Sequence, residues 1–398
     1  MAQQNPNQKP TTSTAPENMP PDAREALSRL NAVLREGAAL LKSEYFWRDH
    51  AAWLETQGYK LRPRYQPGWE PDIPAFENVP PNNEEWVPMA RGGIVDAIRV
   101  KDGKRVLMKR IYRSSHPYEV EITTLFGTEP LASDPRNYCV QLQDTLYPPD
   151  HPDITIIVLP FLLPINTLPF DTVGEIVDFV QQIFSGLQFI HQNHVAHRDI
   201  GVTNLMMDGV EIFPDGWNQG FPYLTPDGRR QTNFFTRTQR PPKYYFIDFG
   251  LSRRYDPSDP NPQEEAIMGG DRTVPEFQID QETFNPFHTD IYYVGNTIRR
   301  LITEGTDIDI GYYGMDFIEP LIKDMVQDDP AKRPTIDEVV TRFEDICKKL
   351  GPWKLRSRPI PRHGGIFKGL QHHIEHWKRR IQYIAQGVPP IPSPRPSK

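Results

Sequence analysis

The chain has 398 residues and a formal net charge of −7, with two cysteines, Cys139 and Cys347. This length is enough for two compact parts with substantial cores. Two cysteines make no disulfide framework, so we expect an intracellular protein of the cytoplasm or nucleus. Residues 1–22 lack the apolar core of a signal peptide, and the longest apolar run, residues 154–163, is too short for a transmembrane segment.

The N-terminal part of the sequence is predicted to be an extension that precedes a larger domain. Residues 1–22 are rich in Pro, Gln, Asn and Thr, a composition that predicts disorder. One helix is predicted over residues 22–42 and a second over residues 44–57. The Pro-rich residues 59–84 are expected to form an extended linker or to wrap around the following lobe, so residues 23–84 are interpreted as a helical extension with a Pro-rich linker.

The middle of the chain is predicted to contain strands followed by a buried helix. Strands are expected near residues 94–100 and 104–111, with a tight turn between them. Apolar residues recur at helical spacing over residues 180–190, which indicates a buried helix. Residues 208–243 are rich in Gly, Pro and Asp and are predicted to be a surface insertion, since they are longer than a hairpin requires.

The C-terminal extension, residues 351–398, is basic. Residues 348–398 contain 12 Lys or Arg and one acidic residue, while the rest of the chain is net acidic. We expect this tail to dock on its own domain, and the alternative is that it binds a membrane surface or a partner. No recognisable nucleic-acid module is present. A helix is predicted near residues 370–385, and its expected docking face carries apolar residues at helical spacing: Leu370, Ile374, Trp377 and Ile381.

Two polar motifs carry the functional signal of the sequence. The first is His197-Arg198-Asp199 followed by Asn204, and the second, after the insertion, is Asp248-Phe249-Gly250. The predicted helix leads into the first motif, and the aromatic run at residues 244–247, typical of a strand, leads into the second. Their order and spacing resemble the catalytic loop and metal-binding turn of the eukaryotic protein kinase superfamily.

This resemblance covers about residues 85–350 and implies a fold and an activity. The implied fold is α+β and bilobal, with a small β-rich lobe over about residues 85–160 and a large, mainly helical lobe over about residues 165–350. The stretch 236–254 also resembles a fungal group of protein kinase domain-containing proteins of unassigned role, which indicates the fold and no substrate. The implied activity is transfer of the ATP γ-phosphate to a Ser or Thr hydroxyl of a protein substrate, with ATP and Mg²⁺ as cofactors.

The resemblance also implies roles for individual residues. Asp199 would accept the proton of the substrate hydroxyl, while Asn204 and Asp248 would hold Mg²⁺. Lys109, in a strand similar to the one that carries the phosphate-binding lysine of kinases, would contact the ATP phosphates. Its ion-pair partner is expected in the following helix, where Glu121 is preferred and Glu119 is the alternative. The other expected nucleotide contacts are two glycines before the first strand and two hinge residues: Gly92, Gly93, Pro160 and Leu162.

Three further motifs resemble the structural scaffold of the superfamily. Glu276 and Arg333 are expected to form a buried ion pair, and Asp290 is expected to anchor the backbone of the catalytic loop. In the superfamily, an arginine at the position of Arg198 commonly needs an anion from the segment that follows the second motif. Acidic side chains there would supply it without phosphorylation: Glu264, Glu265 and Asp271. The alternative is a phosphate group on one of the hydroxyls of this segment: Ser252, Tyr255, Ser258 or Thr273.

The sequence departs from the kinase pattern at three places. Only Gly92 and Gly93 stand where the pattern has three spaced glycines. Gly201 stands where Ser/Thr kinases usually carry a lysine, and Gly269 where they carry the threonine that bridges to it. The four positions that the kinase pattern uses in catalysis are intact: Lys109, Asp199, Asn204 and Asp248. We therefore expect an active enzyme. The alternatives are a pseudokinase that acts as an ATP-binding or scaffold protein and, less favoured, a small-molecule kinase.

Overall fold

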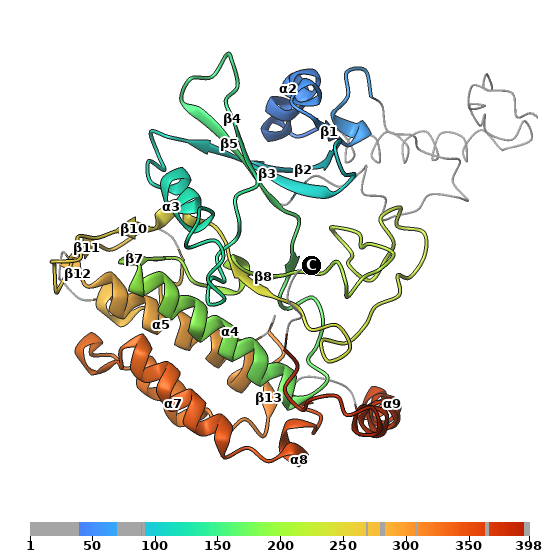
Figure 1. The fold of residues 1–398 in the computed structure, drawn as a ribbon, viewed down its shortest axis with the longest axis vertical. Helices are drawn as coiled ribbons and strands as arrows, with labels where there is room; N and C mark the ends of the chain where they lie inside the picture. The colour runs from blue at the N-terminus through green and yellow to red at the C-terminus, as the bar shows by residue number, and fades with distance from the viewer. Residues whose placement is uncertain are drawn as a thin grey trace, which may run out of the picture. The chain divides into compact units, whose positions relative to one another are not determined.

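The computed structural model describes residues 40–69, 89, 92–267, 270–278, 283–306, 309–362 and 366–393, with side chains of the last range described from residue 375. The chain divides into two compact units, residues 1–104 with 215–232 and residues 105–214 with 233–398. Helices and antiparallel strands are mixed, so the fold is α+β (Figure 1). The lobe boundary predicted near residues 160–165 lies inside the second unit.

The first unit joins the N-terminal extension to the first predicted strand. It contains α2 (Tyr45–Thr56), β1 (Tyr59–Leu61) and β2 (Ile94–Arg99), and β1 pairs antiparallel with β2. The second N-terminal helix is therefore confirmed as α2. At the start of residues 59–84 the chain packs on the sheet and is not a free linker, because residues 59–61 alternate buried and exposed side chains and form an edge strand. The expected disorder of residues 1–22, the helix over 22–42 and most of the linker lie outside the described residues.

A buried carboxylate fixes the N-terminal extension within this unit. Glu44 accepts hydrogen bonds from Arg64 at 3.0 Å and from the Tyr65 hydroxyl at 2.9 Å. Gly92 lies against the same region: a Cβ at this position would clash with the side chain of Ser43, and the Gly92 carbonyl accepts from the Trp47 indole. A glycine at 92 is thus required by packing alone.

The second unit begins with antiparallel strands and one short helix. The strands are β3 (Arg105–Tyr112), β4 (Asp144–Leu146) and β5 (Ile154–Pro160), with β5 between the other two. In β3, Val106 and Met108 point into the core, so Lys109 is presented on the other face. The helix α3 (Glu119–Phe126) follows β3 in the chain.

The rest of this unit is mainly helical. Thr172 caps α4 (Val173–Gln192) by accepting from the Glu175 N–H, and Phe184 of this helix packs edge-on against Phe343. The predicted buried helix over residues 180–190 is confirmed as part of α4. The other helices are α5 (Pro286–Ile298), α6 (Glu319–Met325), α7 (Ile336–Lys348), α8 (Pro352–Leu355) and α9 (Ile366–Ala385).

Short strands join the loops around these helices and form three two-stranded sheets and one three-stranded sheet among the described residues. Residues 208–243 connect the strands β8 (Leu205–Met207) and β9 (Tyr244–Phe246). They contain an isolated bridge between Leu224 and Gln231. None of the described helices has the length and hydropathy needed to cross a membrane. The short strands are β6 (Leu163–Pro164), β7 (Val195–Ala196), β8 (Leu205–Met207), β9 (Tyr244–Phe246), β10 (Arg253–Arg254), β11 (Glu264–Glu265), β12 (Thr283–Phe284), β13 (Tyr312–Tyr313) and β14 (Ile360–Pro361).

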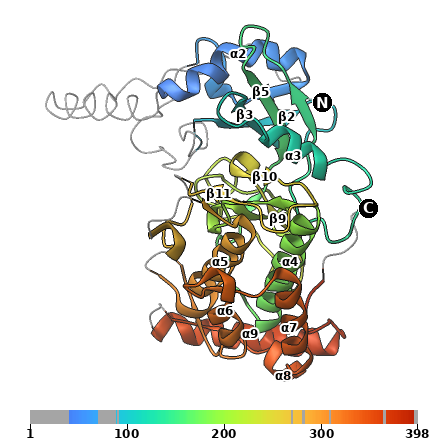
Figure 2. The same cartoon turned by 90° about the vertical axis from the view of Figure 1, so that its left-hand side faces the viewer.

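The helix α9 contacts this unit through a polar face. Figures 1 and 2 show α8 and α9 at the end of the unit that is farthest from β5. Arg379 donates to both carboxylate oxygens of Asp171, at 3.0 and 2.7 Å, and the hydroxyls of Tyr383 and Thr236 lie 2.9 Å apart. Burial alone would raise the pKa of Asp171, but hydrogen bonds from His376 and Arg379 bring it below its ordinary value.

The apolar face predicted for this contact is wrong where the structure describes it. Trp377 is 49% exposed and Ile381 is 64% exposed, whereas the neighbouring His376, Arg380 and Tyr383 are buried. The partly buried Asp171 carboxylate needs cationic partners, so it selects the basic face of the helix. The side chains of Leu370 and Ile374 lie outside the described residues.

We predict that Arg379→Gln lowers the free energy of unfolding by about 1–3 kcal/mol, because it leaves Asp171 partly buried without its ion-pair partner. Lys378→Gln is the matched control, since Lys378 is the exposed neighbour in the same helix. Thermal melts of both variants test this, and an equal shift for the two would contradict the assigned face.

Candidate active site

The backbone of the loop at residues 197–199 is fixed by one buried carboxylate. Asp290, on α5, is fully buried and accepts from the N–H of His197 at 2.7 Å and of Arg198 at 2.8 Å. Arg198 has a φ of 67°, a left-handed conformation that costs free energy in a non-glycine residue. The two hydrogen bonds hold that conformation, so the predicted anchoring role of Asp290 is confirmed.

His197 connects the two motifs. Its Nε2 lies 3.1 Å from the carbonyl of Ile247, the residue before Asp248, and its Nδ1 lies 3.3 Å from the N–H of Asp199. Nε2 faces an acceptor and Nδ1 faces a donor, so the two ring nitrogens have different roles. The histidine thereby sets the spacing between the loop that carries Asp199 and the turn that carries Asp248.

Asn204 orients Asp199 and keeps one oxygen available. Its Nδ2 donates to both the carbonyl and Oδ2 of Asp199, each at 2.8 Å. Its Oδ1 is buried and has no hydrogen-bond partner among the described residues. A buried amide oxygen without a partner costs free energy unless a ligand fills that position.

Lys109 bridges two carboxylates. Its Nζ is 2.8 Å from Asp248 Oδ1 and forms an ion pair with Glu119. Burial would raise the pKa of Asp248, but the Lys109 ammonium lowers it below its ordinary value, so this carboxylate is charged at neutral pH. Asp248 itself has a φ of 66° and caps the turn that follows it, which turns its side chain toward Lys109.

The expected partner Glu121 is therefore wrong, and Glu119 takes its place. The helix α3 begins at Glu119, which is buried together with Ile122 and Phe126 on one face, while Glu121 is exposed. Residues that are two positions apart in a helix face different directions. The apolar residues three and seven positions after Glu119 were the signal in the sequence that identifies the inward face.

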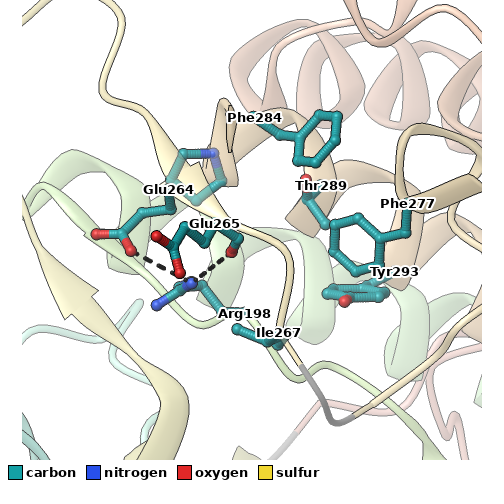
Figure 3. Close-up of a pocket in the computed structure, with 9 residues that line it drawn as sticks. Arg198, Glu264, Glu265, Ile267, Phe277, Phe284, Thr289 and Tyr293 are labelled. Atoms are coloured by element: carbon teal, nitrogen blue, oxygen red, sulfur yellow. Dashed lines mark hydrogen bonds and ion pairs between the residues drawn. The ribbon is translucent and has the colours of Figure 1, made fainter. Parts of the chain in front are cut away.

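Arg198 meets an acidic side chain of the following segment. Its guanidinium lies 3.3 Å from Glu264 Oε2 and donates to the Glu265 carbonyl at 3.1 Å. Figure 3 shows these groups on one side of a small pocket, with Phe277, Phe284 and Tyr293 on the other. Ile267, Pro286 and Thr289 complete the lining.

The remaining expected residues are placed without a decisive contact. Gly93 lies in the turn before β2. Pro160 ends β5 opposite Val106, and Leu162 is half-buried between β5 and β6. A Cβ at Gly201 would meet nothing within 4 Å, so sterics do not require glycine there. Gly269 lies outside the described residues.

The donor set suits a hard cation more than a transition metal. The described residues contain no cluster of three or more His, Cys, Asp or Glu side chains of the kind that holds a metal alone. Asp248 offers a charged carboxylate and Asn204 a buried amide oxygen, and Mg²⁺ prefers oxygen ligands, usually with substrate phosphates among them. The oxygen ligands present therefore fit Mg²⁺.

Comparison with known proteins supports a kinase relationship at a coarse level. No protein-family model matches the chain. A stretch of 215 residues is 23% identical to the light-sensor protein kinase of Ceratodon purpureus, covering 46% of this chain and 14% of that relative. The chain thus corresponds to a small part of that protein, and the similarity supports a relationship to protein kinases without extending to its other properties.

The expected ion pair between Glu276 and Arg333 is confirmed. Two hydrogen bonds join the side chains at 2.8 and 2.6 Å, and the side chains are 1% and 0% exposed. The Thr289 hydroxyl also donates to Glu276 at 3.0 Å. Thr289 lies in α5 and precedes Asp290 in the chain. Through the Thr289 hydroxyl, the pair is therefore connected to the helix that carries Asp290.

We predict that Glu276→Gln lowers the free energy of unfolding by about 3–5 kcal/mol, because it leaves the Arg333 charge buried without its counterion. The matched control is Lys332→Met, which breaks an exposed pair with Asp329 and should cost less than about 1 kcal/mol. Chemical denaturation of both variants measures the difference, and similar losses would contradict the role of the buried pair.

Proposed function

We propose that this chain is an ATP-dependent protein kinase with a bilobal kinase domain, and that it transfers the γ-phosphate of ATP to a Ser or Thr hydroxyl. The observation that carries the proposal is the convergence of two separate motifs and one lysine. Asn204 holds Asp199, Lys109 holds Asp248, and His197 connects the two. The distant similarity to a protein kinase supports the same reading.

Asp199 has the position of a proton acceptor. Asn204 holds one of its carboxylate oxygens and its carbonyl, so the side chain is oriented before a substrate arrives. The incoming hydroxyl would donate to this carboxylate and be aligned for attack on phosphorus. Orientation of this kind removes part of the entropic barrier to the reaction.

Asn204, Asp248 and Lys109 would bind the nucleotide with its cation. Asn204 Oδ1 and the Asp248 carboxylate would hold Mg²⁺, and Lys109 would contact the ATP phosphates. The bound cation would neutralise charge on the transferred phosphoryl group. Glu119 keeps the Lys109 ammonium directed toward Asp248 and prevents it from turning to solvent.

The proposal also assigns the C-terminal segment to the kinase domain, through Arg379 and Tyr383 of α9. The main alternative for the whole chain is a pseudokinase that binds ATP or serves as a scaffold. ATP binding alone does not separate the two readings, whereas phosphate transfer does.

We predict that Asp199→Asn reduces phosphate transfer by roughly 10²–10⁴-fold, because the proton acceptor is lost, while ATP binding persists. The measurement is transfer from radiolabelled ATP to a mixture of Ser/Thr-containing peptides, with affinity for Mg·ATP measured in parallel. Asp208→Asn, an exposed aspartate at the end of β8, is the control. Equal transfer by Asp199→Asn and wild type would refute the assignment.

We predict that Glu119→Gln lowers transfer by on the order of 10–10²-fold, because Lys109 loses the partner that positions it. Glu121→Gln removes the same charge two positions away on the exposed face and should transfer at the wild-type rate. Rates of the two variants, each with its melting temperature, test the corrected pairing. If Glu121→Gln is the impaired variant, the geometry described for α3 is wrong.

A further inference from the structure

The helix α9 exposes an apolar face that its contact with Asp171 does not use. The residues of this face are spaced four and three apart, which places them on one side of a helix. Their side chains are 49%, 64% and 50% exposed, in this order: Trp377, Ile381 and Ile384. Trp353 of α8 is 72% exposed as well.

An arginine joins the two helices into one surface. The guanidinium carbon of Arg380 lies 4.5 Å from the centre of the Trp353 ring and 4.8 Å from that of Trp377. The two exposed tryptophans therefore border the same guanidinium group, one from α8 and one from α9. Contiguous exposed apolar residues mark interaction sites, whereas single exposed residues are ordinary. We call these residues, with the neighbouring Arg356, the α8–α9 surface: Trp353, Arg356, Trp377, Arg380, Ile381 and Ile384.

Arg380 is nearly buried in this surface without an acidic partner. It is 8% exposed, its Nε has no hydrogen-bond partner among the described residues, and a terminal nitrogen lies 3.4 Å from the Trp353 carbonyl. No carboxylate of the described residues forms an ion pair with Arg380 or with Arg356. The two aromatic rings attract the cation but offer its N–H groups no oxygen acceptor. Such an arginine is stabilised when an anion binds beside it.

Arg356 adds a second positive charge near the first. Burial, followed by the charge of Arg380, lowers the pKa of Arg356 from its ordinary value, although an arginine stays charged at physiological pH. Arg356 also donates to the carbonyl of Val388, in the segment after α9. Two like charges near each other favour an anion that contacts both, and guanidinium groups bind phosphate through paired N–H donors.

The surroundings of the two arginines favour a lipid phosphate over an acidic peptide. Tryptophan is concentrated where a membrane meets water, and an amphipathic helix that lies on a membrane combines apolar residues with Lys and Arg. The segment has the required excess of positive charge, because residues 348–398 contain 12 Lys or Arg and one acidic residue. In both views α9 lies at the edge of its unit, where a flat surface can approach it (Figures 1 and 2).

We propose that the α8–α9 surface binds an anionic membrane. Phosphate groups of lipids would pair with Arg380 and Arg356, and the tryptophan and isoleucine side chains would enter the interfacial layer. The residues that hold Asp171 stay on the protein, so α9 would contact the protein and the membrane with different sides. Membrane binding of this kind does not depend on phosphate transfer.

The test is sedimentation of the full chain with vesicles of phosphatidylcholine, with and without phosphatidylserine. We expect the wild type to bind the vesicles that contain phosphatidylserine, and to bind less as salt is raised. Ile381→Ser should weaken this binding by roughly 10-fold, because one apolar side chain no longer enters the membrane. Arg380→Gln should weaken it by about 5-fold, the effect of one positive charge near an anionic membrane. Tyr147→Ser, which removes an exposed aromatic side chain between β4 and β5, is the control and should bind like the wild type.

Melting temperatures separate an effect on binding from an effect on folding. Ile381 is exposed, so its replacement should leave the melting temperature unchanged even if Arg380→Gln lowers it. The proposal is overturned if the wild type ignores phosphatidylserine vesicles or binds equally to vesicles without that lipid, or if Ile381→Ser and Tyr147→Ser lose binding equally.

A soluble polyglutamate peptide tests the competing class of partner. If it binds as tightly as the vesicles and Ile381→Ser abolishes that binding, the surface serves an acidic protein segment and the membrane proposal is wrong. Phosphate transfer is measured separately with radiolabelled ATP. Its absence would overturn the proposed function and leave the result on membrane binding unaffected.

Discussion

The buried carboxylate of Asp290 is the constraint on which the rest of the site depends. It accepts the backbone N–H groups of His197 and Arg198 and also contacts His191 Nε2 at 3.0 Å. A fully buried carboxylate is stable only when it is surrounded by donors, so the loop cannot leave without a large cost. The helix α5 that carries Asp290 is fixed in turn, because Thr289 donates to Glu276 and Glu276 is held by Arg333.

This chain of contacts extends to the segment that borders the pocket. Arg198 projects from the same strained loop and forms an ion pair with Glu264 of β11, an acidic side chain that belongs to the sequence itself. A phosphate group would supply the same kind of charge only after modification. Ser252, one possible phosphate acceptor in this segment, is fully buried and donates to the His197 carbonyl at 2.9 Å. The geometry thus favours an anion that belongs to the sequence over one that is added.

Much of the fold and site was predictable because motif spacing reports residues that one loop or turn must hold together. The Glu276–Arg333 pair and the anchoring by Asp290 followed from such motifs. The predictions that were wrong depended on which face of a helix turns inward. Glu119 and Glu121 differ only in direction, and α9 turns its basic side inward because Asp171 lies opposite it. The contact of Gly92 with Ser43 joins residues far apart in the chain, which no local pattern reveals.

The two glycines near Asp199 are glycines for different physical reasons. At Gly201 a Cβ would meet nothing within 4 Å, so sterics do not require a glycine there. At Gly270 a positive φ and the close approach of Asp199 exclude a side chain altogether. The helix α5 fixes the loop that carries Asp199 through the Asp290 carboxylate, so one rigid helix controls the backbone of that loop.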